Sequence, residues 1–208
     1  MFLEIKMETK VDTKNWVPVG NYIMLKPSKI AHKPNKFIVD SIMEDNAFEV
    51  IGFGSSFKAP GLKDICAIGD KVLIIEPTEI KSAGTKITIG SDEVWFYPPQ
   101  TVAAVLKLKT ESEYEIIPVN DFVMLERAEA ETKIGNIIIP TSAEEKSTHA
   151  HVAIIGNGKS ADDEEYKFEI EVGDEVLISK WTNNEIEINE KTYIIAKEKE
   201  ILAKVEKN

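Results

Sequence analysis

The sequence predicts an all-β protein built from two small β-barrels in tandem. Short segments rich in isoleucine and valine are separated by Gly-Asp, Asn-Asn and Gly-Asn-Gly, and no stretch of ten residues shows a helical period. The second half of the chain also repeats the pattern of the first half. Several short strands within about 95 residues favour a small barrel, because closure removes exposed strand edges.

The repeat starts with V-P-V-G-N-Y-I-M-L-K at 17–26 and I-P-V-N-D-F-V-M-L-E at 117–126. Further matches follow in the same order. The number of residues between matching positions stays close to 100, and for the last strand we set it at 100. They are the apolar triplets 37–39 and 137–139, the glycine-containing segments 49–54 and 151–158, the segments 68–74 and 172–178, and the last strands 102–107 and 202–207. Matches in one order at a nearly constant offset indicate a duplicated unit. We therefore divide the chain into a first unit at 1–107, a polar linker at 108–115 and a second unit at 116–208.

The strands inside each unit are predicted from runs of β-branched and aromatic residues. The Gly69-Asp70 and Gly173-Asp174 pairs predict tight turns that lead into an interior strand. The predicted strands are 22–25, 72–75, 86–89, 94–97 and 102–107 in the first unit, and 122–125, 152–155, 176–179, 185–188, 192–195 and 202–207 in the second.

Charge and composition exclude several classes of function. The formal net charge is -11, and Arg127 is the only arginine, so the chain lacks the basic clusters that bind phosphate backbones. Cys66 is the only cysteine, which excludes an internal disulfide and indicates a reducing compartment. No apolar run approaches the roughly 18 residues of a membrane span. The first ten residues resemble neither a secretory signal nor a transit peptide.

The most unusual segment is 133–151, where Ile137, Ile138 and Ile139 stand among Gly, Asn, Pro, Ser, Thr and charged residues. Two interpretations fit this pattern. The triplet is either a short edge strand or buried hairpin arm, or the apolar tip of a flexible loop that docks into another protein.

The second unit resembles the GroES-type co-chaperonins. The resemblance covers 116–207 and is carried by I-P-V-N-D-F-V-M-L, the I-I-I-P-T-S-A-E-E-K-S-T segment, A-I-I-G-N-G, V-G-D-E-V-L-I and the final I-L-A-K-V-E. The first unit resembles the family weakly and lacks a Lys-Ser-Thr exit from its loop. Tandem members of the family occur in plastids and divergent ones in bacteriophages, and the N-terminus favours a bacterial or phage-infected cytoplasm over a plastid.

The resemblance implies a ring-shaped lid on a GroEL-type ATP-dependent chaperonin, enclosing an unfolded client protein. The chain itself would then be a homo-oligomer that binds no ATP, cofactor, metal, nucleic acid or membrane and does no covalent chemistry. The docking tip would be Ile137, Ile138 and Ile139, with a possible second tip at Phe37, Ile38 and Val39. The strand edges that join barrels would contain Val17, Val19, Val102, Val105, Ile117, Val119, Leu202 and Val205.

Side-by-side barrels are expected to pair the last strand of the first unit, 102–106, with residues 117–119 of the second. This arrangement gives an even number of barrels, with eight barrels from four chains expected. The alternative is two stacked tiers of barrels.

The histidine pair and the acidic segment of the second unit allow other interpretations. His149 and His151 share one face of a predicted strand, but a zinc site needs three or four ligands. The acidic segment 159–171 is either a solvated loop or a hydrophilic ceiling of the chamber. The competing function is a structural or assembly protein, for instance of a phage particle, that uses GroES-like barrels without binding a chaperonin.

Overall fold

The structure is a computed structural model of the chain. It describes residues 16–30, 47–75, 84–89, 92–128, 133–134, 137–138, 147–159, 165–182 and 184–206, with the backbone alone for Pro60 and for residues 133–134 and 137–138. Strands dominate these residues, which confirms the predicted all-β class. In these described ranges there is one α-helix, the single turn α1 (Pro60–Lys63). In the described part of the chain, no helix has the length and apolar character needed to cross a membrane.

The first half of the chain forms most of a seven-stranded antiparallel sheet, in the order β4-β5-β1-β2-β3-β6-β7. Its strands are β1 (Ile23–Pro27), β2 (Ala47–Phe53), β3 (Lys71–Ile74), β4 (Thr85–Ile89), β5 (Asp92–Tyr97), β6 (Val102–Thr110) and β7 (Glu113–Pro118).

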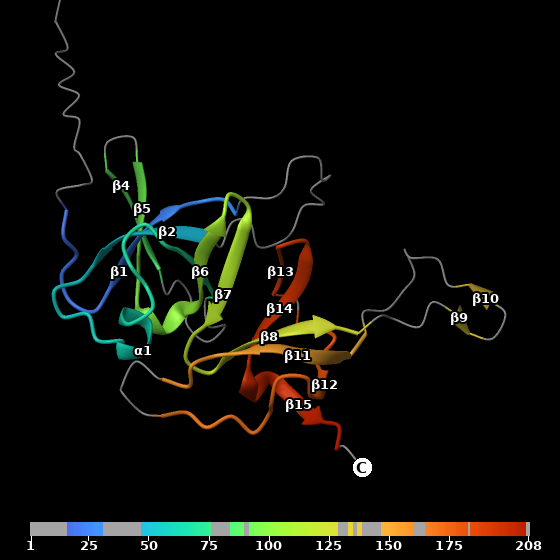
Figure 1. Ribbon diagram of the computed structural model, residues 1–208. Coiled ribbons are helices and arrows are strands. Elements are labelled where there is room, and N and C mark those ends of the chain that lie inside the picture. Colours follow the sequence, from blue (N-terminus) through green and yellow to red (C-terminus); the bar gives the residue numbers. More distant parts are fainter. Residues whose placement is uncertain are drawn as a thin grey trace, which may run out of the picture.

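The second half forms a six-stranded antiparallel sheet, in the order β13-β14-β8-β11-β12-β15. Its strands are β8 (Phe122–Arg127), β11 (His149–Ile155), β12 (Glu175–Ile178), β13 (Glu185–Ile188), β14 (Lys191–Lys197) and β15 (Ile201–Lys204). Two short strands, β9 (Lys133–Ile134) and β10 (Ile137–Ile138), form a separate sheet that lies apart from both large ones (Figure 1).

Every strand predicted from composition overlaps an observed one, and β2 was not predicted as a strand. The two predicted turns are also observed: Gly69 and Gly173 have φ values of 94° and 91°, and their amides donate to Val50 and Val152 at 2.8 Å. Glycine suits these positions because a positive φ strains residues with a Cβ.

The two sheets share one topology. The order β5-β1-β2-β3-β6 in the first sheet corresponds to β14-β8-β11-β12-β15 in the second, and the ladders have their irregularities at matching places. Val72 pairs with Val105, and Val176 pairs with Lys204. The last strands therefore correspond at an offset of 99, and the sequence alignment at 100 was wrong by one residue, because a one-residue change lies between the first strand and the last.

The strand pairings do not close either sheet into a complete barrel among the described residues. Each sheet curves around its own apolar cluster, and the first cluster is rich in aromatic rings: Phe48, Trp95 and Tyr97 lie with ring centroids 5.7–6.0 Å apart. The corresponding part of the second cluster holds Ala150, Ile194 and Ala196. The two halves thus share a fold but fill it with different side chains.

A hairpin joins the halves. Residues 108–115, expected to be the linker, form the outer part of the ladder between β6 and β7, with a turn at 111–112. A third apolar cluster crosses from one half to the other, and it includes Leu73, Ala104, Leu106, Phe122 and Ile186. α1 contacts the second half as well, since Asn157 donates to the Gly61 carbonyl at 2.9 Å. The halves therefore pack directly on one another.

Candidate binding edges and docking loop

The seam between the halves is formed by the last strand of one and the first strand of the other. Val105 pairs with Ile117, and the Val119 amide donates to the Ala103 carbonyl at 3.0 Å. The expected pairing of 102–106 with 117–119 is confirmed within the chain. Val102, Val105 and Val119 are fully buried at this seam, and Ile117 is partly buried.

Backbone contacts show which residues of the first half correspond to the strand after this seam. The Gly54 amide donates to Tyr22 at 2.8 Å, as the Gly156 amide donates to Phe122 at 2.9 Å. The first strands therefore correspond at an offset of 100, so Val19 is the counterpart of Val119.

The counterparts of buried seam residues are exposed at the two ends of the molecule. Val119 is 0% exposed and Val19 is 82% exposed. Four more apolar residues of the first half are exposed: Trp16, Val17, Tyr22 and Ile87. Their counterparts in the second half are buried or partly buried: Ile116, Ile117, Phe122 and Ile186. On the second half, the exposed residues Leu202 and Val205 have buried counterparts, Ala103 and Leu106. We call 16–22 with Ile87 the first open edge and β15 with Val205 the second open edge.

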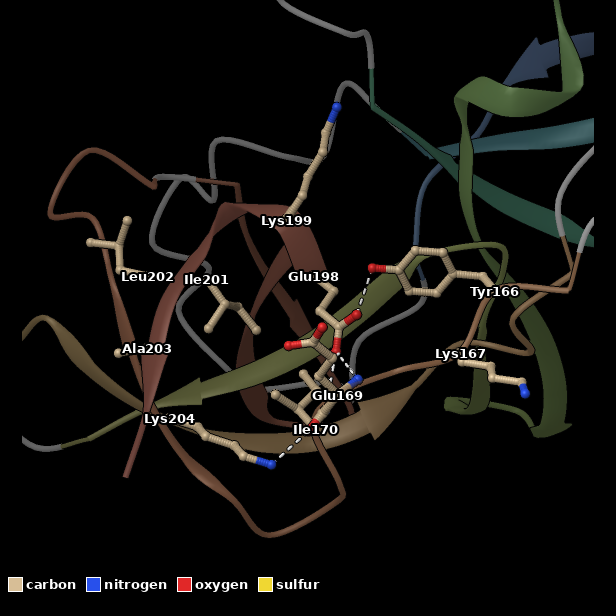
Figure 2. A pocket seen from close by; sticks show the side chains of 10 residues that line it. All are labelled: Tyr166, Lys167, Glu169, Ile170, Glu198, Lys199, Ile201, Leu202, Ala203 and Lys204. Carbon is tan, nitrogen blue, oxygen red and sulfur yellow. Dashed lines mark hydrogen bonds between the residues drawn. The ribbon is translucent and has the colours of Figure 1, made fainter. Parts of the chain in front are cut away.

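The second open edge has room for one more strand. β7 lies beside β6 in the first sheet, whereas the described residues place no strand at the corresponding position beside β15. A groove of about 450 Å³ lies along this edge (Figure 2). Its lining residues are Tyr166, Lys167, Glu169, Ile170, Glu198, Lys199, Ile201, Leu202, Ala203 and Lys204. In the first half, Cys66, the counterpart of Ile170, belongs to the same apolar cluster as Val119, and Ile117 packs against that cluster.

A buried carboxylate holds one wall of the groove in place. Glu198 is 8% exposed, and its carboxylate accepts hydrogen bonds from the Tyr166 hydroxyl at 2.6 Å and from the amides of Glu169 and Ile170 at 2.7 and 3.1 Å. Figure 2 shows Tyr166 pointing toward this carboxylate. The hydrogen bond to Glu198 raises the pKa of Tyr166 to about 12, because ionised tyrosine could no longer donate. Lys204 of β15 donates to the Glu169 carbonyl at 2.6 Å and ties the same wall to the strand.

The predicted docking tip lies in a segment that the structure describes only in part. Ile137 pairs with Ile134 and Ile138 pairs with Lys133, so the first two isoleucines form one arm of a short hairpin. Their side chains and all of Ile139 lie outside the described residues. The second predicted tip, Phe37, Ile38 and Val39, lies outside them as well.

Both ends of the segment 128–147, which contains the predicted docking tip and is called the docking loop below, are fixed to the second sheet. The Ala128 amide donates to His149 at 2.9 Å, and the Ile178 amide donates to Thr148 at 2.8 Å. The Arg127 guanidinium donates to the Ser147 carbonyl, and to the Thr182 carbonyl at 3.0 Å.

The remaining candidates are two histidines, the cysteine and the acidic segment. His149 Nδ1 lies 2.8 Å from a Glu175 carboxylate oxygen, and within the described part of the chain no group of three His, Cys, Asp or Glu residues could hold a metal ion. Cys66 is buried, and this burial raises the pKa of its thiol to about 12, which makes it a poor nucleophile. Glu169 and Glu171 of the acidic segment are described, whereas Asp162, Asp163 and Glu164 lie outside the described residues.

Sequence reasoning missed two residues that shape these surfaces, Arg127 and Glu198. In the sequence, Arg127 served only to exclude nucleic-acid recognition, because it is the only arginine. A single arginine at the start of a loop is nevertheless a signal of a role in the structure. Glu198 lies in K-E-K-E, which reads as a solvated charge run, and nothing local marks it as buried.

Comparisons with known proteins agree with this geometry. A sequence model of the Cpn10 family, described as the chaperonin 10 Kd subunit, matches residues 115–205. The chain is 41% identical over 92 residues to a co-chaperonin GroES of Clostridium botulinum, covering 44% of this chain and 98% of the relative. It is 42% identical over 94 residues to the co-chaperonin GroES of Clostridium kluyveri, covering 44% of this chain and 99% of the relative.

The fold and the open edges define a tandem all-β protein with two related halves, and the second half carries almost the full length of these relatives. The chain belongs to the Cpn10 family, the chaperonin 10 kDa subunits that include co-chaperonin GroES. The fold is GroES-like, the first half fits a divergent copy, and the family supports a co-chaperonin role, which is not an enzyme activity.

Proposed function

We propose that the chain is a co-chaperonin that assembles head to tail into a ring and caps a GroEL-type chaperonin. The two units, 1–107 and 116–208, act as neighbouring barrels of that ring. The observation that carries the proposal is the exposure of Val19 at 82% where Val119 is 0% exposed. The same apolar motif is buried inside the chain and bare at its end.

The seam supplies the geometry of the proposed contact between chains. Residues 16–19 of one chain would lie along β15 of the next, as 116–119 lie along β6. With the offsets of 100 and 99, the Val105–Ile117 pair corresponds to Lys204 with Val17 of the next chain. The second half cannot use its own β7 for this contact, because β7 is already paired with β6.

The free energies of burial and association show that the contact between chains must bury more than two valine side chains. Burying Val17 and Val19 would contribute about 3–6 kcal/mol, at about 1.5–3 kcal/mol each. Association costs about 4–15 kcal/mol in lost freedom, so two side chains do not suffice. Trp16, Tyr22 and Ile87 lie on the same open edge and enlarge the apolar face, as their buried counterparts do at the seam.

Since each chain contributes two barrels in fixed order, first and second barrels alternate around the ring. Closure then requires an even number of barrels, and we expect eight barrels from four chains.

The docking loop would act through Ile137, Ile138 and Ile139. Burying three isoleucines contributes about 4–9 kcal/mol, at about 1.5–3 kcal/mol each. Ordering about six residues costs about 6–12 kcal/mol at about 1–2 kcal/mol each, so a single loop binds marginally. Several loops on one ring bind with a high effective concentration, and weak single contacts let the lid leave when the chaperonin changes state. A tip at Phe37, Ile38 and Val39 would add a second kind of loop.

The closed chamber would hold an unfolded client protein, with ATP bound by the chaperonin and the acidic segment at 159–171 as a hydrophilic ceiling. We place the protein in a bacterial or phage-infected cytoplasm, as the bacterial relatives and the single cysteine, Cys66, suggest.

Co-sedimentation with a GroEL-type chaperonin, with and without ATP, tests the proposal. The wild-type chain should sediment with the chaperonin only when nucleotide is present. Ile138→Asp should abolish this binding, because an unpaired carboxylate does not enter an apolar groove, and it should leave the circular dichroism spectrum unchanged.

Ile38→Asp is the matched control in the first unit and should weaken binding less. Full binding by the Ile138→Asp protein would show that the triplet is not the docking tip. Native mass spectrometry tests the ring: an assembly of seven chains would contradict the expected ring of four chains and favour stacked tiers.

One observation favours a second function, that of a structural protein: the family model does not extend over the first half. A structural protein of a phage particle could use the same open edges without binding a chaperonin. It would assemble normally and show no ATP-dependent binding.

A further inference from the structure

Arg127 occupies a place where three segments of the second half meet. It ends β8, at the point where the docking loop begins. Its Nη1 donates to the Ser147 carbonyl at the end of the loop. Its Nη2 donates to the carbonyl of Thr182 at 3.0 Å, in the connection between β12 and β13. The same Nη2 lies 3.3 Å from a carboxylate oxygen of Glu185, at the start of β13. One side chain therefore links the beginning of the loop, its end and a neighbouring turn.

This anchor extends further into the loop than the sheet does. The backbone bonds of Ala128 with His149 and of Thr148 with Ile178 belong to the ends of the ladders. Ser147 lies one residue beyond them, and its carbonyl is held by the arginine. The Ser147 hydroxyl also accepts from the His149 amide at 3.1 Å, which turns the chain at this point.

Stability alone does not favour an arginine here. The side chain is 16% exposed, and its buried Nε has no hydrogen-bond partner among the described residues. An unsatisfied buried donor is costly, and replacing a whole buried ion pair by apolar groups is often neutral or stabilising, although removing one partner alone is destabilising. What arginine offers instead is a planar fork whose donors point in fixed directions. Two of those directions are used by carbonyl groups of separate segments.

We propose that Arg127 is a positioning residue that sets the direction in which the docking loop leaves the second sheet. The inference rests on the proposed function, since the orientation matters through binding to a GroEL-type chaperonin. The effect comes through direction and preorganisation, because the closure entropy of a loop changes only slowly with its length. A loop held in its binding direction loses less freedom on docking, and the gain is multiplied over the loops of one ring.

Among the described residues, the first half shows no equivalent anchor at the start of its loop. The counterpart of Arg127 is Pro27, which has no donor in its side chain or at its backbone nitrogen. The start of the first loop is held by other means: Lys71 donates to the Lys29 carbonyl, and Ile30 is 6% exposed in the apolar cluster between the halves. The two loops of one chain thus leave their sheets from differently built bases.

The test compares Arg127→Met and Arg127→Lys with the wild type, all as full-length assembled protein. Binding to a GroEL-type chaperonin with ATP is measured together with amide exchange and the melting temperature. Arg127→Met should weaken binding about tenfold, and Arg127→Lys less, because lysine keeps the charge but lacks the fork. In the free protein, exchange should become faster at Ser147 and Thr182 and stay unchanged in β14.

Lys191→Met is the matched control. Lys191 pairs with Glu126, the neighbour of Arg127 on β8, at 3.2 Å, and this interaction, seen among the described residues, involves neither end of the loop. This variant should bind the chaperonin as the wild type does. If Arg127→Met does not fold, the Arg127→Lys protein decides through its exchange pattern and its affinity.

Unchanged affinity of a folded Arg127→Met protein would overturn the inference. So would a lower melting temperature with unchanged affinity of the folded fraction, because that result describes a purely structural role. Absence of binding by the wild type is a different failure, which overturns the proposed function itself.

Discussion

The seam inside the chain and the open edges at its ends carry the same motif in opposite environments. I-P-V at 117–119 is paired with β6, and Val119 is fully buried, whereas V-P-V at 17–19 leaves Val19 82% exposed. The strand that would receive it, β15, has a groove of about 450 Å³ along its free edge. The single chain therefore leaves the apolar residues of its ends exposed, and the proposed contacts between chains would bury them.

Exposed strand edges are a liability, because they pair with any chain that offers an edge. Here Val119 belongs to the apolar cluster of the first half and Ile117 packs against it, so we expect the groove beside β15 to accept the corresponding residues, Val19 and Val17. Selectivity for residues 16–19 would therefore come from shape as well as from backbone pairing.

The sharpest way to break this comparison is to place a carboxylate in both motifs. Val119→Asp should destabilise the chain by more than about 4 kcal/mol, because an unpaired charge would be buried at the seam. Val19→Asp should change the stability of the unassembled chain by less than about 0.5 kcal/mol and abolish assembly. Urea unfolding and native mass spectrometry measure the two effects. Intact rings from Val19→Asp protein would show that this edge does not join chains.

A cysteine footprint can sharpen the comparison. Leu202 is 70% exposed on β15, and its counterpart Ala103 is buried at the seam. Leu202→Cys should react readily with iodoacetamide at pH 8 in the unassembled chain and become protected on assembly. Ala103→Cys should be protected in both states. The native Cys66 provides a silent background, because burial raises the pKa of its thiol to about 12. Equal labelling of Leu202→Cys before and after assembly would remove β15 from the interface.

The smallest expected effect concerns the hydrogen bond between Tyr166 and Glu198 in the wall of the groove. The hydrogen bond to Glu198 raises the pKa of Tyr166 to about 12, from an ordinary value of 10. This bond stabilises the folded chain fully below pH 10, and its contribution is lost as the pH rises toward 12. Tyr166→Phe should remove that part of the pH dependence of unfolding. Identical stability curves for both proteins between pH 9 and 12 would show that the bond contributes nothing to stability.

The repeat allowed much of the fold to be predicted, because apolar periodicity and turn residues are local signals. The pairing of 102–106 with 117–119 was expected from the order of the strands and from the family resemblance, and the observed Val105–Ile117 pair confirms it. β2 was missed because its seven residues, A-F-E-V-I-G-F, lack clean alternation. The bridging of Arg127 to Ser147 and Thr182 could not be predicted, since it depends on segments 20 and 55 residues away.

The docking tips remain sequence predictions, because the structure does not describe the side chains of Ile137 and Ile138. What the structure adds is the base from which the loop begins and ends. A pattern of residues indicates that a loop is apolar, whereas its orientation depends on contacts that only the folded chain brings together.

The covalent hairpin between β6 and β7 has a consequence for dilution. In any closed assembly of this chain, every second barrel contact lies inside a polypeptide and does not dissociate when the protein concentration falls. A ring of single barrels would lose one barrel at each dissociation step, whereas this chain would leave or join the proposed ring as a preformed pair. A ring built from such pairs needs fewer than half as many association steps as a ring of the same size made from separate barrels, so its formation would depend less steeply on concentration.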